Sequence, residues 1–204
     1  MKKITDIKQQ VKNVTRCNVY LDNCFYCGLE LETVMRYRLK VGMEIEEERL
    51  DEIQFDSERT RAMDKALNFI SRTKKTEKQV RDYLCGKGYT DRTAEEVIGK
   101  MQDYGYLDDG DYAADFAKSA SAKKGKRLIA AELRRKGVGE NDVEKALDVI
   151  GDETESAYAV AEKYMRNKER DKTNILKCYK YLLSKGFDYD TARAATEKLM
   201  PDGE

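Results

Sequence analysis

Apolar residues follow a helical spacing through most of this chain, and the same pattern returns at a fixed interval. From residue 57 onward apolar positions recur every three or four residues, as expected for helices with one buried face. Three short segments end this pattern in nearly the same way, and their glycines, Gly88, Gly137 and Gly186, stand 49 residues apart. A constant interval of this length predicts three stacked copies of one supersecondary unit.

The repeated segment has the form Leu-x-x-Lys-Gly followed by an apolar residue. It occupies residues 84–89, 133–138 and 182–187. Glycine is favoured just after a helix because it adopts positive φ without a steric penalty, and the next apolar residue then folds back on the helix. The lysine suits the negative end of the helix dipole. We therefore expect these segments to end the second helix of each copy.

Apolar positions stay in register from copy to copy. The corresponding sets are Val80, Ile129 and Cys178; Leu84, Leu133 and Leu182; and Met101, Ile150 and Leu199. Residues 76–79, Thr-Glu-Lys-Gln, have the pattern of a capping box and predict the start of a helix. The predicted fold is mainly α, with three tandem three-helix repeats of period 49 in a curved array.

The first 55 residues have a different pattern. Two β-rich segments, 18–21 and 24–27, flank Asp22-Asn23, which predicts a hairpin turn. A short helix is expected over residues 30–40, with Gly42 as its stop. The predicted domains are residues 1–55 (β-hairpin plus short helix), 56–107 (repeat 1), 108–153 (repeat 2, basic) and 154–204 (repeat 3). The N-terminal segment could cap the array, as the ends of repeat proteins commonly require.

Composition narrows the class of protein. The 204 residues are 40% apolar and 38% charged, with zero net charge and a single proline, Pro201. The apolar share is enough for small cores, and the scarcity of proline favours helices. No apolar run approaches the length of a membrane span, and no secretory signal is visible at the N-terminus. With five cysteines, an odd number, a reducing compartment is favoured. We expect a cytoplasmic protein.

The absence of histidine excludes His-based acid–base catalysis and His-containing metal sites. Cys24-x-x-Cys27 supplies only half of the ligands of a structural zinc site, and it lacks the βαβ context of a redox motif. Such thiols in a hairpin strand are more often small hydrophobes. Gly86-Lys87-Gly88 is expected to be a helix end rather than a phosphate loop, because the same Lys-Gly segment ends the second helix of each copy. The acidic segment 108–111 is too short for a calcium loop, and capping of the next helix explains it better. We expect no enzyme activity, no cofactor and no metal.

A basic segment is the strongest local signal for function. Between residues 118 and 136 only Glu132 opposes eight basic residues. The second helix of repeat 1 also has more basic than acidic residues. A solvated helix face is the alternative, but two copies with the same bias favour a surface for a phosphate-rich or acidic partner. The candidate binding residues are Arg72, Lys74, Lys75, Lys78, Arg81, Lys123, Lys124, Lys126, Arg127, Arg134, Arg135 and Lys136.

Three segments of the chain resemble those of a known protein family. Segments 71–77 (Ser-Arg-Thr-Lys-Lys-Thr-Glu), 105–113 (Gly-Tyr-Leu-Asp-Asp-Gly-Asp-Tyr-Ala) and 125–138 (Gly-Lys-Arg-Leu-Ile-Ala-Ala-Glu-Leu-Arg-Arg-Lys-Gly-Val) carry the match. Over essentially its full length the chain resembles RecX, the regulatory protein of the bacterial recombinase RecA. The resemblance implies a non-enzymatic protein of DNA repair, recombination and the SOS response. It would bind the RecA filament on single-stranded DNA and limit filament growth, ATP hydrolysis and strand exchange.

Two other readings of the basic segment stay open at this point. A direct DNA-binding module that acts on RecA only indirectly would bind naked single-stranded DNA as tightly as the filament. A structural adaptor for another protein would need no basic cluster and would bind independently of salt. A filament-binding protein with a basic middle repeat should instead lose affinity steeply as salt rises. We expect a monomer with no membrane contact.

Overall fold

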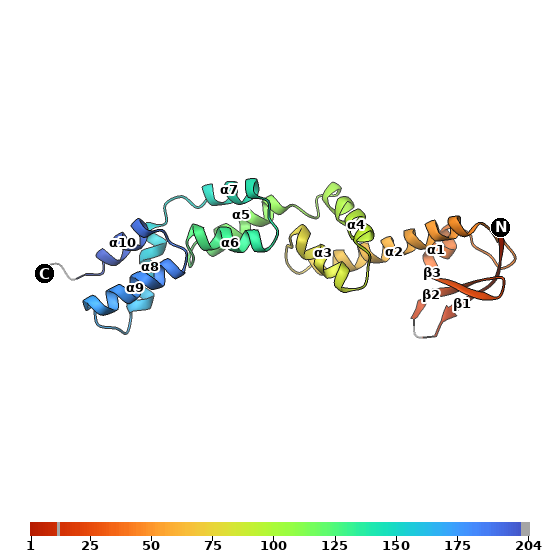
Figure 1. Cartoon of the computed structure of the whole chain (residues 1–204), viewed down its shortest axis with the longest axis horizontal. Coiled ribbons are helices and arrows are strands. Elements are labelled where there is room, and N and C mark those ends of the chain that lie inside the picture. The colour runs from red at the N-terminus through yellow and green to blue at the C-terminus, as the bar shows by residue number, and fades with distance from the viewer. Residues whose placement is uncertain (12, 201–204) are drawn as a thin grey trace. The chain divides into compact units, whose positions relative to one another are not determined.

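The computed structural model describes residues 1–11 and 13–200, so Pro201 and the end of the third predicted unit lie outside the described residues. The chain forms two compact units (Figure 1). The first comprises Met1–Thr73 and Val80–Tyr106, and the second comprises Lys74–Gln79 and the chain from Leu107 onward.

An antiparallel sheet of four strands begins the first unit. The strands are β1 (Lys2–Gln10), β2 (Asn13–Leu21), β3 (Cys24–Glu30) and β4 (Glu44–Ile45), in the order β3-β2-β1-β4. β2 and β3 form the predicted hairpin, and both turn residues, Asp22 and Asn23, have positive φ as a two-residue type I′ turn requires. The prediction of a hairpin alone is therefore too small, because β1 and β4 extend it into a sheet.

A short helix, α1 (Leu31–Arg36), follows β3 within the segment predicted as helical. The predicted stop at Gly42 is wrong. Arg38 takes a positive φ of 52° instead, and the N–H of Leu39 donates to the carbonyl oxygen of Val34 at 3.0 Å. Gly42 lies in the turn before β4, where its N–H donates to the carbonyl oxygen of Ile4 at 2.8 Å. This glycine fixes the sheet rather than a helix end.

A continuous helix, α2 (Glu47–Ile70), runs from the sheet into repeat 1. Its first half buries Leu50 and Ile53 in the core of the sheet, and its second half buries Ala62 and Ala66. At roughly 100° per residue, Leu50 and Ala66 point in directions about 160° apart. The helix therefore packs one face on the sheet and another on repeat 1, and the predicted domain boundary between residues 55 and 56 falls inside it.

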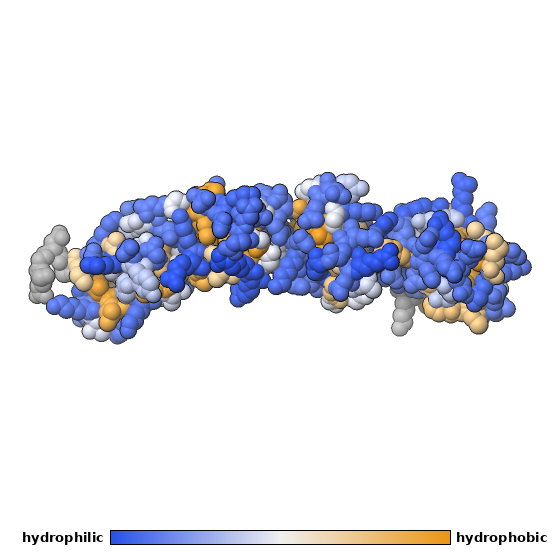
Figure 2. Space-filling view, turned by 45° about the horizontal axis from the view of Figure 1, so that its top comes forward, coloured by the Kyte–Doolittle hydropathy of each residue, from blue (hydrophilic) through white to orange (hydrophobic). Residues whose placement is uncertain are grey.

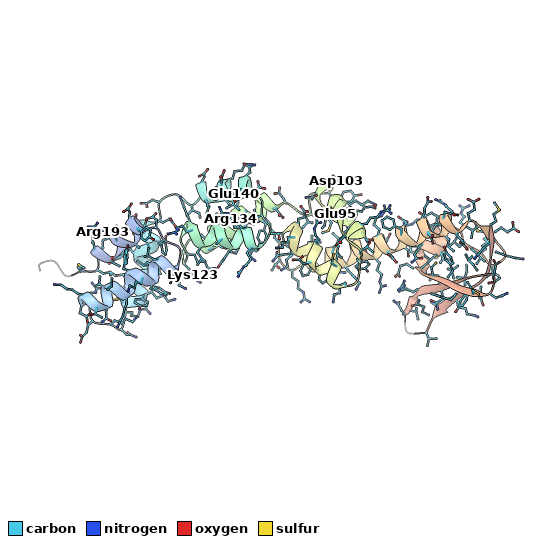
Figure 3. The ribbon with its side chains drawn as sticks, viewed as in Figure 1. Glu95, Asp103, Lys123, Arg134, Glu140 and Arg193 are labelled. Atoms are coloured by element: carbon cyan, nitrogen blue, oxygen red, sulfur yellow. The ribbon has the colours of Figure 1, made fainter. Side chains whose placement is uncertain are left out.

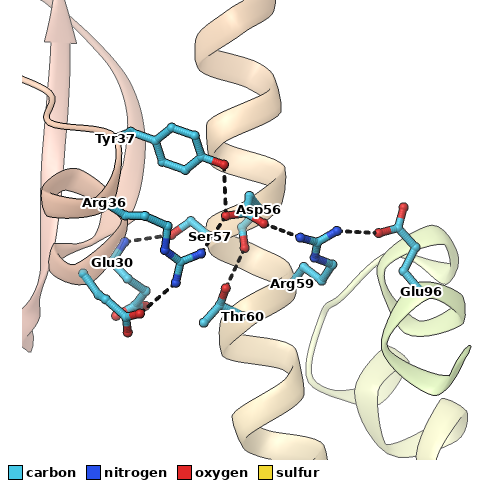
Figure 4. A network of polar contacts seen from close by, with 9 residues as sticks. Glu30, Arg36, Tyr37, Asp56, Ser57, Arg59, Thr60 and Glu96 are labelled. Atoms are coloured by element: carbon cyan, nitrogen blue, oxygen red, sulfur yellow. Dashed lines mark hydrogen bonds and ion pairs between the residues drawn. The ribbon is translucent and has the colours of Figure 1, made fainter. Parts of the chain in front are cut away.

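A polar network at the middle of α2 connects the sheet side of the unit to repeat 1 (Figure 4). Asp56 accepts hydrogen bonds from Arg36 at 3.0 Å and from Tyr37 at 3.2 Å. Arg59 donates to the same carboxylate and, at 3.2 Å, to Glu96 on α4 (Asp91–Asp103). The network is therefore held by three helices of one compact unit.

Repeat 1 is completed by α3 (Glu77–Gly86) and α4, and the second unit contains the six helices of repeats 2 and 3. They are α5 (Asp109–Ala120), α6 (Lys126–Arg135), α7 (Glu140–Asp148), α8 (Thr154–Met165), α9 (Lys172–Ser184) and α10 (Tyr189–Glu197). The positions that the sequence places in register are buried, except for Ile150, which is half-buried. Repeats 2 and 3 each enclose an apolar core of their own.

The predicted mainly α fold with three three-helix repeats is therefore confirmed. Its division at residues 55, 107 and 153 remains a prediction. Within residues 1–11 and 13–200, no helix is both long and apolar enough to cross a lipid bilayer.

Candidate binding surface

The second helix of every repeat ends with the same backbone geometry. Gly88, Gly137 and Gly186 have φ of 88°, 92° and 88°. In each case the glycine N–H donates to the carbonyl three residues back, and the next N–H reaches the repeated leucine five residues before it. This is the Schellman arrangement, which satisfies carbonyl groups that a helix end would leave unpaired. The prediction that these segments end helices is confirmed.

Two of these helix ends also receive the start of another helix. At the end of α9, Lys185 and Gly186 accept hydrogen bonds from the N–H groups of Gly125 (2.9 Å) and Arg127 (3.2 Å), at the start of α6. Glu153 accepts from the N–H of Lys126 at 2.6 Å. A Cβ on Gly125 would lie 2.3 Å from backbone atoms of Gly186 and Phe187, so only glycine permits this approach. Repeats 2 and 3 are joined by backbone contact.

The start of α3 makes the equivalent contact within the second compact unit. The hydroxyl of Thr76 donates to the carbonyl oxygen of Lys136 at 2.7 Å, and Asp109 accepts from the N–H of Glu77 at 2.8 Å. Thr76 and Gln79 form the predicted capping box, with distances of 3.1 and 3.2 Å. Asp108 caps α5 by accepting from the N–H of Asp111, so the predicted capping role of segment 108–111 is confirmed as well.

The basic side chains of α6 lie on its solvent side. Ile129, Ala130 and Leu133 are buried in the core of repeat 2, whereas Arg127, Arg134 and Arg135 are exposed. Lys123 is exposed in the turn before the helix, and Arg134 lies beside Glu140 of α7 (Figure 3). A basic surface on repeat 2 is therefore present, but its charge has to be counted with the helices packed against it.

Acidic residues from other elements neutralise part of the predicted set. Arg134 forms a bidentate ion pair with Glu140, and this pair raises the pKa of its guanidinium group. The ammonium group of Lys124 lies 2.7 Å from the carboxylate of Glu132. The other pairs are Lys74 with Asp111 and Asp115, and Arg81 with Glu95. The hydrogen bonds that the Lys74 ammonium group donates to both aspartates raise the pKa of Lys74. Counting charge along the chain, where only Glu132 opposed the basic residues, therefore overstates the charge of the surface.

Lys78, Lys126 and Lys136 contribute to packing. The ammonium group of Lys78 is 3.4 Å from the carbonyl oxygen of Arg135, and Lys136 lies over the rings of Tyr112 and Phe116 at 5.8 and 5.4 Å. Lys126 is half-buried where its N–H meets Glu153. Lys136 is the repeated lysine of the Leu-x-x-Lys-Gly segment. The sequence pattern predicted its position at the end of the helix dipole but not its aromatic neighbours.

The remaining basic residues lie on both compact units. Lys118, Lys123, Arg127 and Arg135 are exposed on the second unit, where Arg127 also lies 5.9 Å from the ring of Tyr189. Arg72 is exposed on the first unit, and Lys75 is half-buried on the second. Arg72, Lys74 and Lys75 precede α3, so their assignment to the second helix of repeat 1 is wrong. Lys78 and Arg81 do belong to that helix.

The two cysteines of the hairpin differ in environment. Cys27 is buried in the core of the sheet, and burial raises the pKa of its thiol to about 11. Cys24 is exposed, so the expectation of a buried small hydrophobe is wrong for this residue. Among the described residues, no three His, Cys, Asp or Glu side chains lie together as a metal site.

The face drawn in Figure 2 is largely hydrophilic, with small and separate hydrophobic patches. Large contiguous apolar patches mark many protein interfaces, whereas charged surfaces favour phosphate-rich or acidic partners. The basic side of repeat 2 is thus the candidate binding surface.

Comparison with known proteins identifies relatives along the whole chain. Residues 2–46 match the model of the "Regulatory protein RecX N-terminal domain". Residues 62–101, 108–147 and 151–196 match those of the first, second and third three-helix domains of RecX.

Curated relatives and solved structures agree with these matches. "Regulatory protein RecX" of Clostridium perfringens (strain 13) is 34% identical over 205 residues, which cover 98% of this chain and 97% of the relative. The protein of the same name from Bacillus subtilis (strain 168) is 30% identical, over 96% of this chain and 76% of the relative. A crystal structure of regulatory protein RecX matches with a TM-score of 0.70 and 25% identity, over 97% of this chain and 100% of the other.

Proposed function

Because the chain belongs to the RecX family of regulatory proteins, we propose that it modulates the recombinase RecA by binding the RecA filament on single-stranded DNA. Its binding limits filament growth, ATP hydrolysis and strand exchange. The protein does this without catalysis of its own, in the cytoplasm and as a monomer.

The exposed cations of repeat 2 are the observation that supports this proposal. Lys118, Lys123, Arg127 and Arg135 project from one three-helix repeat in a protein of zero net charge. DNA phosphates and acidic patches on the recombinase both attract such a surface. Each further module adds weak contacts along a filament, and linked weak contacts combine into strong binding.

The test is inhibition of RecA ATPase activity on single-stranded DNA by a variant with Lys123, Arg127 and Arg135 changed to Glu. We expect at least about a tenfold higher protein concentration for half inhibition, because three favourable contacts become repulsive. The matched control changes Lys172, Lys177 and Lys180 of α9 to Glu, which alters the same charge on exposed residues of repeat 3. Equal inhibition by both variants would remove repeat 2 from the binding surface.

A direct DNA-binding module is the second candidate, and the exposed cations of repeat 2 also favour it. The two candidates differ in their preference for the filament. We expect tighter binding to the RecA filament than to naked single-stranded DNA at physiological salt, together with loss of affinity as salt rises. Equal affinities for both would favour direct DNA binding.

A further inference from the structure

A docking arrangement occurs twice in the second compact unit, and its parts recur at a third place. In both complete copies, the Lys-Gly end of a helix receives the N-terminus of another helix. A carboxylate, Glu153 in one copy and Asp109 in the other, accepts a hydrogen bond from the first turn of the incoming helix. We call the Lys-Gly helix end with its carboxylate a Lys-Gly docking site. It binds the N–H groups that every helix N-terminus leaves without internal partners.

The third Lys-Gly helix end is Lys87–Gly88, in the first compact unit. Its backbone geometry is the same, with φ of 88° at Gly88. A Cβ on Gly137 or Gly186 would lie 2.5 or 2.4 Å from atoms of the docked helix, whereas a Cβ on Gly88 would meet nothing within 4 Å. Gly88 is also exposed. The space that a helix N-terminus fills at the other two copies is therefore open here.

A polar pocket of about 230 Å³ opens beside this helix end. Its charged lining residues are Arg16, Glu30, Glu58, Arg61, Lys65 and Lys87. Glu58 supplies a carboxylate, as Asp109 and Glu153 do in the complete copies. Glu30 is already paired, with Arg16 at 3.4 Å and Arg61 at 3.6 Å.

The charge of the pocket indicates what it would accept. Its lining holds four cationic side chains against two carboxylates, so it favours a ligand with negative charge. Helix N-termini commonly carry Asp or Glu in the first turn, where the helix dipole favours them. Such a helix offers N–H donors to the Lys-Gly carbonyl groups and carboxylates to the cations.

We propose that Lys87–Gly88 and its pocket form a docking site for the N-terminus of an α-helix with an acidic first turn, supplied by another protein. The N-cap residue of that helix is small, because Gly125 and Thr76 start the two helices docked in the complete copies. This site lies on the first compact unit, whereas the basic surface of repeat 2 belongs to the second. It does not depend on the proposed function.

A second copy of this chain does not offer a matching helix at the end of its repeats. Counting 49 residues on from Gly125 reaches Asn174, but α9 begins about one turn earlier, with Asp171 as its N-cap. The first turn of α9 contains no acidic residue and begins with Lys172. The start and the charge of α9 therefore both differ from what the pocket requires. Helix α7 does have a glycine N-cap and an acidic first turn, but its carboxylates are already paired, Glu140 with Arg134 and Asp142 with Lys145.

The experiment uses the full-length protein and a synthetic helical peptide of about 18 residues, long enough to form a helix in water. The probe is alanine-rich and begins Thr-Glu-Glu, and the control peptide has the same composition with both glutamates in its last turn. Binding is followed by NMR through the backbone amide signals of Gly88, Tyr89, Gly137 and Gly186. We expect the probe alone to shift Gly88 and Tyr89 and to leave Gly137 and Gly186 unchanged.

Protein variants define the contribution of the pocket. Changing Arg61 and Lys65 to Glu should weaken probe binding about tenfold or more, since two attractive charge pairs become repulsive. Changing Lys87 to Glu tests the contribution of positive charge at the exposed helix end itself. The control variant changes Arg92 and Lys100 of α4, outside the pocket, and should bind like the unchanged protein.

Three results would overturn the proposal. One is the absence of any shift at Gly88 with millimolar probe. Another is an equal response to the probe and to the control peptide. The third is self-association of the protein in sedimentation experiments, with Gly88 at the interface, since a second copy would then be the occupant. None of these measurements requires RecA, so their failure leaves the proposed function untouched.

Discussion

The contact between repeats 2 and 3 should be disrupted by a single methyl group at residue 125. Gly125 is the N-cap of α6, and its φ of −79° and ψ of 161° are accessible to alanine. The backbone therefore tolerates Gly125→Ala, but the new Cβ would lie 2.3 Å from Gly186 and Phe187. Normal contact needs about 3.4 Å, so the two helices must separate by about 1 Å.

The expected cost follows from the bonds that cross this contact. The N–H groups of Gly125 and Arg127 donate to carbonyl oxygens at 2.9 and 3.2 Å, and that of Lys126 donates to Glu153 at 2.6 Å. Two neutral bonds at about 1 kcal/mol and one charge-assisted bond at about 2 kcal/mol give an upper limit of about 4 kcal/mol. Relaxation around an overpacked methyl group typically costs 1–3 kcal/mol. We expect Gly125→Ala to destabilise the contact by about 2–4 kcal/mol.

The matched control is Gly139→Ala. Gly139 is the N-cap of α7, has φ of −66° and ψ of 151°, and a Cβ there meets nothing within 4 Å. It therefore reports the cost of replacing an N-cap glycine by alanine, without the clash. Urea denaturation followed by circular dichroism, with hydrogen exchange at the Arg127 amide, compares the two variants. Equal urea midpoints and equal protection of Arg127 would refute the reasoning from close approach.

Two further predictions concern buried ionisable groups. Burial raises the pKa of the Cys27 thiol to about 11, so at pH 8 about one molecule in a thousand carries the reactive thiolate. A maleimide should therefore modify exposed Cys24 well before Cys27, as mass spectrometry of peptides would show, and equal rates would contradict the burial. Burial also raises the pKa of Glu153 above its ordinary 4.5, so the native state binds the proton more tightly than the unfolded chain. The contribution of Glu153 to the free energy of unfolding should fall as pH rises from 4.5 through the raised pKa, and urea titrations of Glu153→Gln should lack that slope.

The repeated helices could be predicted because their signals are local. Gly88, Gly137 and Gly186 mark helix ends through their own backbone conformation, and each repeated leucine lies within one turn of its glycine. The register of the three repeats follows directly from these positions. The joining of repeats 2 and 3 through Gly125 was not predicted, since that glycine matters only through a residue 60 positions away, Lys185.

The sheet and the net charge of the basic surface depend on long-range pairing. β1 is mostly polar, with Ile4 as its fully buried residue, and only pairing with β2 and β4 reveals it as a strand. Glu140 lies beyond the counted basic segment and yet neutralises Arg134. Asp111 and Asp115 pair with Lys74 across some forty residues of sequence. Such pairs cannot be found by counting charges within a window.

The continuous course of α2 restricts how the length of this protein can change. A loop between two domains would absorb an inserted residue, whereas one residue added between Ile53 and Ala62 would rotate everything after it by about 100°. If the residue is added between Asp56 and Arg59, the bonds from Arg59 to Asp56 and Glu96 could not both be kept. Only insertions close to whole turns, such as seven residues, would restore the rotational phase, and these would still lengthen the helix by about 10 Å. Relatives of this protein should therefore vary in length at their loops and termini and hold this helical spacing constant.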